Sequence, residues 1–338
     1  MQTQLLTPGD IPEAARLLRA GELVIIPTET VYGLAANALD PQAVANIFAA
    51  KGRPQDNPLI VHISDLEMAM PLVEEFPAKA QLLAQKFWPG PLTIILKKTP
   101  SIPSVTSGGL ETVALRMPAH GVARQIITEA GVPLAAPSAN RSGSPSPTTA
   151  QHCVQDMNGR VAAIVDAGAC DVGVESTVIS LAGPVPVLLR PGAVTPEQLR
   201  EVLGELELHH SILSRLDASE QAGSPGMKYK HYAPKAQVTI VEGTAEQYAR
   251  FLKLHAGSGD FALCFEEDIP NLPPMPYVVY GSAQDSLSQA RRLFDALREL
   301  DKLGAQQAFA HASGKDGLGL AVYNRLLRAA AFRIMNAE

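Results

Sequence analysis

The chain has 338 residues, enough for two domains, and its 46% of hydrophobic and 18% of charged residues exclude a largely disordered protein. The formal net charge of -6 argues against a protein that coats nucleic acid non-specifically, although a local basic groove is compatible with it. Three widely separated cysteines, Cys153, Cys170 and Cys264, predict neither a disulfide framework nor a zinc cluster and favour a reducing cytoplasm.

The N-terminal stretch shows no basic segment followed by an apolar core, so we expect no signal peptide, and no apolar run is long enough to span a bilayer. The first elements predicted are a helix over 8–21, a buried strand over 23–27 and a helix over 41–50. Between the last two, the segment TETVYGL at 28–34 places hydroxyl groups and one carboxylate at a strand end, where open α/β sheets hold their ligands. A plain turn is the alternative for this segment.

The segment KGRPQDNPLIVH at 51–62 carries two cations and ends in a histidine. If the backbone is extended after Ala50, Lys51 and Arg53 point to one side, and the two charges suit a phosphate. The alternative is that both are solvated and complement the dipole of the preceding helix at its C-terminus. A strand over 57–63 would place His62 near its end, beside this cationic loop, as a ligand contact.

The pattern of helices and strands continues to residue 203. We predict helices over 64–75, 77–88, 120–130, 148–157 and 196–203, and strands over 92–96, 112–117, 133–136 and 161–165. Arg116 lies in an apolar run and therefore needs an anionic partner from the protein or from a ligand. The loop 137–147 is rich in hydroxyl groups and suits the phosphates of a nucleotide, with a flexible surface turn as the alternative. The segments 175–179 and 185–192 predict a hairpin in which Arg190 repeats the pattern of Arg116.

The last third of the chain predicts a linker and a second domain. The composition of 206–235 is that of a linker, yet the aromatic and basic residues near its end favour a segment that folds back as a lid over the first domain. Strands over 237–241, 260–265, 277–280 and 307–311 then alternate with helices over 244–255, 283–303 and 317–332. This order predicts a small parallel sheet covered by helices, a Rossmann-like three-layer α/β/α domain, so the expected boundaries are 1–205, 206–235 and 236–338. The loop 314–319 does not match the dinucleotide-binding fingerprint, and nothing in this part indicates a second active site.

A set of motifs in this order resembles the threonylcarbamoyl-AMP synthases. The motifs are TETVYGL at 28–34, KGRP at 51–54, PLIVH at 58–62, SAN at 138–140, EST at 175–177, and SPGM at 224–227 with HYAP at 231–234. The chain is most similar to the long form of that family, which has a YrdC-like domain with a twisted mixed sheet, an active-site linker and a C-terminal Rossmann-like domain.

The resemblance implies an activity and its surroundings. L-threonine, bicarbonate and ATP would give threonylcarbamoyl-AMP and pyrophosphate, the first step towards threonylcarbamoyladenosine in transfer RNA. Mg²⁺ would enter with ATP, with no metal bound tightly by the protein itself. The product would pass to the tRNA threonylcarbamoyl-transferase machinery in the cytoplasm, without a membrane and without a required contact with RNA.

The resemblance also implies roles for individual residues. Lys51 and Arg53 would form the catalytic pair, with Lys51 near the phosphates. The threonine side would be lined by Thr30, His62, Arg116, Ala136 and Ser176. ATP would be held by Arg53, Asn57, Thr112, Ser138, Ser146 and Arg190, with Tyr232 closing the site from the linker.

Two other functions remain compatible with the residues. A non-catalytic RNA-binding module would use the cations at 51, 53, 116 and 190 and would show salt-dependent RNA affinity without release of pyrophosphate. A different ATP-dependent ligase or carbamoyl-transferring enzyme would release pyrophosphate with an acid other than threonine. A pyrophosphate assay with and without threonine and bicarbonate separates the three functions.

Overall fold

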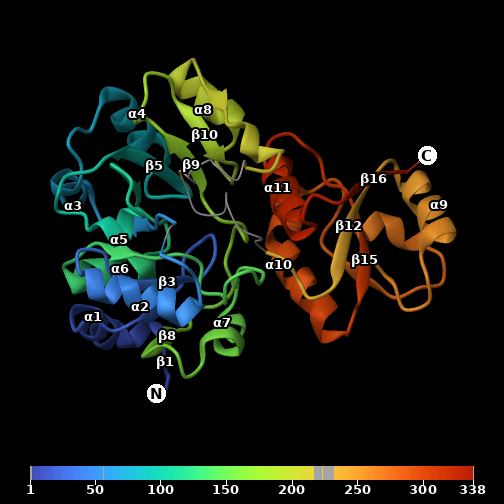
Figure 1. Ribbon diagram of the computed structural model, residues 1–338, viewed down its shortest axis with the longest axis horizontal. Coiled ribbons are helices and arrows are strands. Elements are labelled where there is room, and N and C mark those ends of the chain that lie inside the picture. Colours follow the sequence, from blue (N-terminus) through green and yellow to red (C-terminus); the bar gives the residue numbers. More distant parts are fainter. Residues whose placement is uncertain (1, 56, 217–222, 224–231, 338) are drawn as a thin grey trace.

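The computed structural model describes residues 2–55, 57–216, 223 and 232–337, which form a larger N-terminal and a smaller C-terminal α/β unit (Figure 1). Each unit is built on its own sheet. Over these described ranges, no helix combines the length and the apolar character that crossing a membrane requires. Of the linker and lid predicted over 206–235, residues 217–222 and 224–231 lie outside the described residues.

The N-terminal unit contains a mixed sheet of 11 described strands in the order β1-β8-β2-β3-β7-β4-β6-β5-β9-β10-β11. The sheet contains both parallel pairs, such as β4 with β6, and antiparallel pairs, such as β5 with β6, which confirms the predicted mixed sheet. In chain order the strands are β1 (Gln4–Leu6), β2 (Val24–Ile26), β3 (Gly33–Asn37), β4 (Ile60–His62), β5 (Leu92–Lys97), β6 (Thr112–Arg116), β7 (Leu134–Ala135), β8 (Ala163–Val165), β9 (Thr177–Ser180), β10 (Val187–Arg190) and β11 (Glu207–Leu208).

Helices cover this sheet and bring several loops to one region. They are α1 (Ile11–Arg19), α2 (Pro41–Lys51), α3 (Leu66–Ala69), α4 (Ala78–Phe87), α5 (Ser104–Ser107), α6 (Gly121–Ala130), α7 (Ala150–Met157) and α8 (Pro196–Leu203). Helix α2 shows why its ends are fixed. Asp40 accepts hydrogen bonds from the backbone N–H groups of Gln42 and Ala43, and Gly52 ends the helix in the left-handed conformation with φ of 65°. The fixed ends place Lys51 in the last turn.

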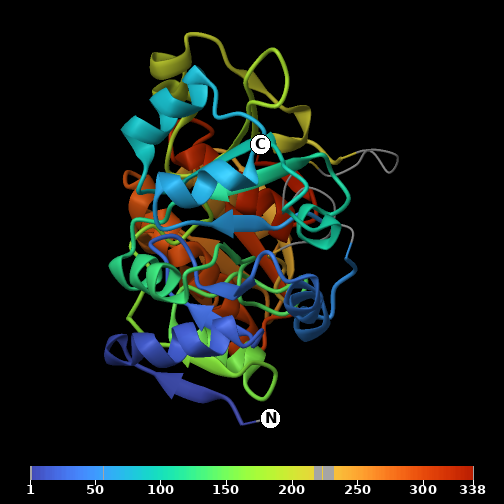
Figure 2. The ribbon, with the colours of Figure 1, turned by 90° about the vertical axis from the view of Figure 1, so that its left-hand side faces the viewer.

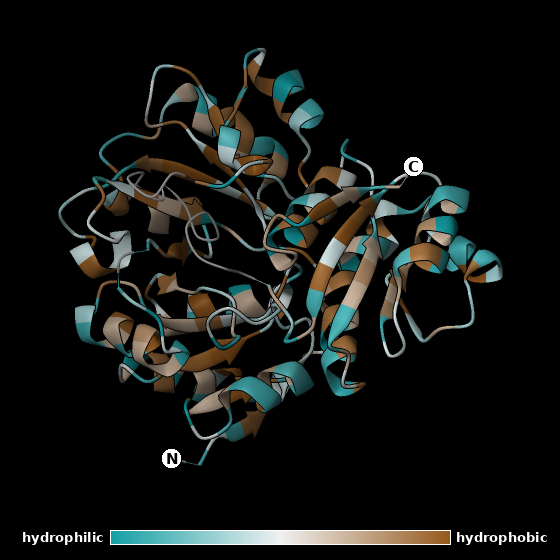
Figure 3. Ribbon diagram, turned by 45° about the vertical axis from the view of Figure 1, so that its right-hand side comes forward, coloured by the Kyte–Doolittle hydropathy of each residue, from teal (hydrophilic) through white to brown (hydrophobic). Residues whose placement is uncertain are grey.

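The C-terminal unit is the predicted Rossmann-like domain. Its five-stranded sheet has the order β14-β13-β15-β12-β16, and every described pair in it is parallel. The strands are β12 (Gln237–Glu242), β13 (Phe261–Cys264), β14 (Tyr277–Val279), β15 (Gln307–His311) and β16 (Ile334–Asn336), and the helices are α9 (Ala245–His255), α10 (Ser286–Lys302) and α11 (Gly319–Ala329). Helices α10 and α11 lie on the side of the sheet that faces the N-terminal unit, and α9 lies on the opposite side (Figure 1). The strands between these helix layers are rich in hydrophobic residues, coloured brown in Figure 3.

Several expected elements differ in the structure. The helix predicted over 64–75 is wrong: α3 is short, and a 3-10 turn over Met70–Leu72 follows it, because Pro71 has no backbone N–H to continue an α-helix. The expected polar loop at 28–34 gives way to β3 at Gly33, which pairs antiparallel with β2. The predicted hairpin is confirmed, since β9 and β10 pair antiparallel.

Part of the expected linker packs on the N-terminal unit. Strand β11 pairs in parallel with β10, and the following turn buries Ile212 in the core of that unit. The domain boundaries themselves stay a prediction.

The two units share their hydrophobic cores. Val31 and Val174 of the N-terminal unit belong to the main apolar cluster of the C-terminal unit, whereas Leu320 of α11 belongs to the cluster of the N-terminal unit. Gly173 approaches α10 so closely that a Cβ atom there would lie 2.4 Å from the carbonyl oxygen of Ala290. Viewed from the N-terminal side, the red and orange helices lie behind the large sheet (Figure 2). The interface is therefore packed like a protein interior.

Candidate active site

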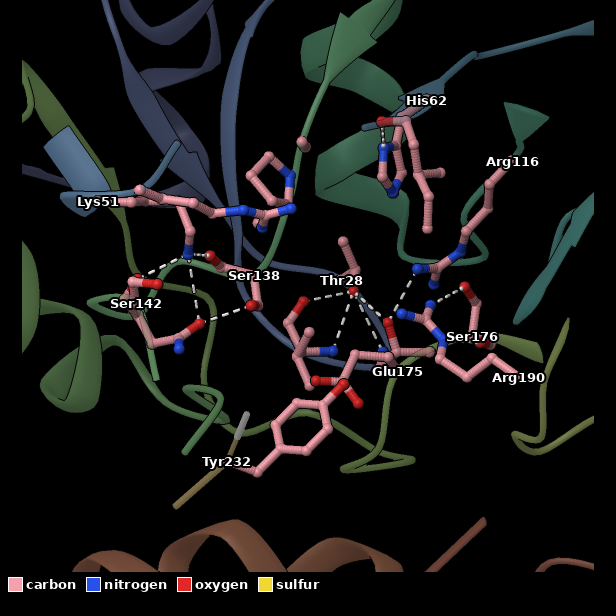
Figure 4. A pocket seen from close by; sticks show the side chains of 18 of the residues that line it. Thr28, Lys51, His62, Arg116, Ser138, Ser142, Glu175, Ser176, Arg190 and Tyr232 are labelled. Carbon is pink, nitrogen blue, oxygen red and sulfur yellow. Dashed lines mark hydrogen bonds between the residues drawn. The ribbon is translucent and has the colours of Figure 1, made fainter. Parts of the chain in front are cut away.

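Segments that are distant in sequence meet around one cavity of about 680 Å³, part of it open to solvent (Figure 4). The cavity is lined by ten of the residues selected from the sequence: Thr30, Lys51, Arg53, His62, Arg116, Ala136, Ser138, Ser176, Arg190 and Tyr232. Four cationic side chains thus meet in one place, from α2 and the loop after it, from β6 and from β10. The cavity is strongly cationic.

Lys51 is buried although it carries an amine. Its Nζ donates hydrogen bonds to the carbonyl oxygens of Ser138 and Asn140, at 2.5 and 2.6 Å. The expected extended backbone after Ala50 is wrong, since Lys51 ends α2 and Gly52 is left-handed. Lys51 and Arg53 nevertheless line the same cavity, because the helix C-cap turns the chain at Gly52. The alternative of solvated helix-end charges is wrong for Lys51, whose side chain is 5% exposed.

The burial of Lys51 changes its proton affinity. Burial, and then the charge of Arg53, lowers the pKa of Lys51 to about 7. The amine therefore exchanges its proton near neutral pH. An anionic ligand beside it would favour the charged form again.

Arg116 finds the anionic partner that its apolar strand requires. Its Nη2 lies 2.7 Å from Oε1 of Glu29, and its Nη1 donates to Oγ1 of Thr30 at 2.9 Å. Burial raises the pKa of Glu29, but the charge of Arg116 outweighs it and holds that pKa below its ordinary value. These contacts join the loop before β3 to strand β6. Arg116 also lines the cavity.

His62, next to Arg116, is a neutral imidazole. It ends β4 directly beside Arg116 in the parallel register with β6. Its Nδ1 lies 3.3 Å from the carbonyl oxygen of Ile60, which can only accept, so Nδ1 carries the proton and Nε2 is an acceptor. Burial, and then the charge of Arg116, lowers the pKa of His62 to about 3.

Ser176 and Arg190 form the third part of the lining. Arg190 donates through Nε to the carbonyl oxygen of Ser176 at 3.0 Å and through Nη2 to its Oγ at 3.1 Å. Oγ of Ser176 also lies 2.8 Å from Oγ1 of Thr93. The antiparallel pair β9–β10 therefore fixes a hydroxyl group and a guanidinium side by side, on the same side of the cavity as Arg116 (Figure 4).

Three residues selected from the sequence do not line the cavity. Asn57 is fully buried next to the left-handed Gly108, and Thr112 begins β6 opposite Lys97. Ser146 is buried and donates to Oε1 of Glu175, a residue of the lining. The expected contacts of these three residues with a nucleotide stay predictions.

Sequence reasoning gave no role to two side chains that organise the site, Glu175 and Asn140. Glu175 lines the cavity and pairs with Arg325 of α11 at 2.8 Å. Asn140 lines the cavity, and its backbone carbonyl oxygen accepts a hydrogen bond from the Lys51 amine. Arg325 lies in an apolar helix, so the reasoning that selected Arg116 could also have selected Arg325 and its carboxylate partner.

The arrangement suits a ligand with two anionic parts. Lys51, Ser138 and Ser142 lie at one end and His62, Arg116, Ser176 and Arg190 at the other, with Tyr232 below both (Figure 4). The described residues contain no group of three or more His, Cys, Asp or Glu side chains that could hold a metal ion. The chemistry available from these side chains is charge neutralisation and positioning.

Comparisons with known proteins give one consistent result. The model of the Sua5, YciO and YrdC family, described as "Telomere recombination", matches residues 16–192, and "Threonylcarbamoyl-AMP synthase, C-terminal domain" matches residues 194–331. The threonylcarbamoyl-AMP synthase of Pyrococcus abyssi is 45% identical over 328 residues, which cover 95% of this chain and 94% of that protein. The Bacillus subtilis enzyme of the same name is 46% identical over 329 residues, covering 96% and 94%. The crystal structure of P. abyssi Sua5 complexed with L-threonine matches with a TM-score of 0.91 and 42% identity, covering 100% of both chains.

Proposed function

The chain belongs to the threonylcarbamoyl-AMP synthase family, and from this premise we propose that its cavity joins L-threonine, bicarbonate and ATP into threonylcarbamoyl-AMP with release of pyrophosphate. The activity is that of a nucleotidyltransferase. The observation that carries the assignment to this cavity is the convergence of Lys51, Arg53, Arg116 and Arg190 on one opening.

The reaction has two bond-forming stages. The threonine amine bonds to the carbon of bicarbonate, water leaves, and a carbamate forms. An oxygen of that carbamate then bonds to the α-phosphorus of ATP while the bond to the bridging oxygen of pyrophosphate breaks. Because negative charge accumulates on the phosphates in the second stage, the site must mainly neutralise charge and hold the partners in line.

The end of the cavity with Lys51 suits the phosphates. The Lys51 ammonium has three N–H donors, and two of them go to the carbonyl oxygens of Ser138 and Asn140. The third makes a long contact of 3.5 Å with Oδ1 of Asn140 and can turn to a phosphate oxygen instead. Arg53 lines the same cavity, close enough for its charge to lower the pKa of Lys51, and offers a planar fork for phosphate oxygens. Ser138 lines it with a hydroxyl group. Mg²⁺ would enter with ATP and would neutralise part of the phosphate charge, beside the cations of Lys51 and Arg53.

The end of the cavity with Arg116 suits threonine. Arg116 faces the threonine carboxylate, and the neutral Nε2 of His62 accepts a hydrogen bond from a donor of the amino acid. Ala136 provides an apolar wall for the methyl group, and Thr30 and Ser176 provide hydroxyl groups. The P. abyssi relative was solved in complex with L-threonine, which supports threonine as a ligand of this cavity.

Exclusion of water is a further requirement, because both the carbamate and the mixed anhydride hydrolyse readily. Tyr232 lines the cavity from the end of the linker and is 5% exposed. It closes the site over the substrates. The product serves the tRNA threonylcarbamoyl-transferase machinery, and the reaction takes place in the cytoplasm, which the reduced cysteines favour.

The test is pyrophosphate release by Lys51→Ala and Arg53→Ala, with threonine and bicarbonate each omitted in turn. We expect each variant to lose at least about 100-fold in kcat/KM, the typical effect of removing one donor to a developing charge. Lys86→Ala is the matched control, because Lys86 is an exposed lysine on α4 whose partner is Glu201. Unchanged melting temperatures would show that the fold is intact.

The outcomes also separate the other functions. Normal turnover by Lys51→Ala would remove Lys51 from the mechanism. Pyrophosphate release that does not depend on threonine would indicate a different ATP-dependent enzyme. Tight, salt-sensitive binding of RNA with no release of pyrophosphate would indicate an RNA-binding module.

A further inference from the structure

Arg325 of α11 is buried between the two units. It is the largest fully buried side chain of the described structure, with 0% exposure. Its Nε donates to Oε2 of Glu175 at 2.8 Å, its Nη2 to the carbonyl oxygen of Glu175 at 3.1 Å, and its Nη1 to the carbonyl oxygen of Pro191 at 2.8 Å. A residue of the C-terminal domain thus holds two separate points of the N-terminal domain.

Both points adjoin residues that line the cavity. Glu175 is itself part of the lining and directly precedes Ser176, and Pro191 directly follows Arg190. Ser176 and Arg190 are hydrogen-bonded to each other through Oγ and Nη2 at 3.1 Å. The three donors of Arg325 therefore fix the backbone on both sides of this pair.

Arg325 also contacts the residue that closes the cavity. Its guanidinium carbon lies 5.9 Å from the centre of the Tyr232 ring, and Phe294 of α10 also packs against this ring, at 5.2 Å between ring centres. Tyr232 has a left-handed backbone with φ of 62°, an unfavourable conformation for a residue other than glycine. The C-terminal domain holds Tyr232 there through these two side chains.

A second buried ion pair between the domains gives the comparison. Arg298 of α10 pairs with Asp156 at 2.7 Å and donates to the carbonyl oxygen of Pro145 at 2.6 Å. Arg298, Asp156 and Pro145 do not line the cavity. Docking of the domains therefore has a separate arginine, and of these two arginines it is Arg325 that hydrogen-bonds to a residue of the cavity lining, Glu175.

We propose that Arg325 is a positioning residue of the active site, supplied by the C-terminal domain, which holds Glu175, Ser176 and Arg190 in the geometry that the substrates require. The inference rests on the proposed function and goes beyond it, because it gives the C-terminal domain a part in turnover. Arg325 is not part of the cavity lining and acts through the Glu175 carboxylate and the carbonyl oxygens of Glu175 and Pro191.

The charge of Arg325 also controls the protonation of Glu175. Burial raises the pKa of Glu175, but the charges of Arg325 and then Arg190 hold it below its ordinary value. Without the Arg325 charge, burial dominates and the pKa of Glu175 rises. A protonated Glu175 is neutral and no longer attracts the arginines around it. A variant without the Arg325 charge should therefore lose activity first at low pH.

The experiment compares Arg325→Met, Arg325→Lys, Glu175→Gln, the double variant Arg325→Met with Glu175→Gln, and Arg298→Met in the full chain. Threonine-dependent pyrophosphate release is measured over threonine, ATP and pH, with the melting temperature of each variant as the folding control. We expect Arg325→Met to lose about 10- to 100-fold in kcat, the typical effect of removing a side chain that orients a functional group. We expect Arg298→Met to keep kcat within about threefold.

The pH profile separates positioning from general stability. In Arg325→Met the acid limb of the pH profile moves to higher pH. In Arg325→Lys it stays in place, because the positive charge remains although the planar guanidinium is lost. In Arg298→Met it is unchanged. The double variant is no worse than Arg325→Met, because both substitutions remove the same pair. If Arg325→Met does not fold, Glu175→Gln and Arg325→Lys still give the comparison.

Equal kinetic losses in Arg325→Met and Arg298→Met with wild-type pH profiles would overturn the inference, as would losses that multiply in the double variant. If the wild-type chain releases no threonine-dependent pyrophosphate, the proposed function fails instead. The two failures are thus distinguishable.

Discussion

Nζ of Lys51 lies 2.6 Å from the carbonyl oxygen of Asn140, and the acceptors of this buried amine in the described part of the chain are all neutral: the carbonyl oxygens of Ser138 and Asn140 and the amide Oδ1 of Asn140. Neutral acceptors do not offset the cost of burying a charge as a carboxylate would. Together with burial and with Arg53, this explains why the pKa of Lys51 falls to about 7. Lys51 should therefore become fully protonated when an anionic ligand binds beside it.

The titration of Lys51 should therefore respond to nucleotide. After reductive methylation with a ¹³C label, the Lys51 signal, identified by its absence in Lys51→Met, should titrate near pH 7 in the free protein. A non-hydrolysable ATP analogue should raise this midpoint by about one unit or more, because phosphate charge favours the ammonium. A midpoint near the ordinary value of 10.5 in the free protein would contradict the prediction.

Lys51 should also give the stability of the protein a particular pH dependence. Its folded pKa of about 7 lies below the ordinary value of 10.5, so between these two pH values the unfolded chain binds more protons. The free energy of unfolding of the wild type relative to Lys51→Met should then rise with pH in this window, by up to about 1.4 kcal/mol per pH unit. Urea unfolding of both proteins from pH 7 to 10 measures this difference. A flat difference would mean that Lys51 is not buried in solution.

His62 should remain neutral through the working range of the enzyme. Its pKa falls from 6.5 to about 3, so its ¹⁵N signals should not change between pH 8 and pH 5. Between pH 6.5 and pH 3 the unfolded chain binds the additional proton, and His62 therefore lowers stability as the pH falls through this range. His62→Gln should flatten this part of the acid unfolding curve relative to the wild type. An imidazole that titrates near 6.5 would show that His62 is exposed.

Gly192 should tolerate no side chain. A Cβ atom at this position would lie 2.4 Å from the backbone nitrogen of Thr177 and 2.8 Å from the carbonyl oxygen of Glu175. Gly192→Ala should destabilise the protein by about 2 kcal/mol or more and lower kcat, because it pushes the chain after Arg190 away from the wall of the cavity. Gly183→Ala is the matched control, since no atom lies within 4 Å of its added Cβ. Its effect on stability should stay within about 0.5 kcal/mol. A Gly192→Ala protein as stable as the control would contradict the contact.

Tyr232 should protect the reaction from water. Tyr232→Phe keeps the ring against Phe294 and should keep the ratio of threonylcarbamoyl-AMP to pyrophosphate near that of the wild type. Tyr232→Ala opens the cavity, so hydrolysis should lower that ratio several-fold. Both products are measured in the same sample. An unchanged ratio in Tyr232→Ala would leave Tyr232 with a packing role only.

Much of the fold follows from local patterns, because long helices and buried strands carry strong signals. The helix ending at Lys51 and the C-terminal alternation of strands and helices were predictable in this way. The short edge strands β1 and β16 were not, since three residues give no periodicity. The left-handed turn at Gly52 also escaped prediction, although it decides where Lys51 and Arg53 point.

The site was less predictable than the elements. The motifs selected the residues of the cavity but gave no spatial order, because the sequence of strands in the large sheet brings β4, β6 and β9 together from distant parts of the chain. The pairing of Arg325 with Glu175 spans 150 positions and depends on how the two domains dock. No local pattern encodes such a contact.

The shared cores of the two units limit how this protein can be divided. A fragment that stops near residue 205 would leave Val31 and Val174 without the apolar surroundings that now bury them, and Glu175 without its cation. Such a fragment would expose an apolar surface that promotes aggregation. Polar substitutions on that surface would be needed before the N-terminal unit could be produced alone.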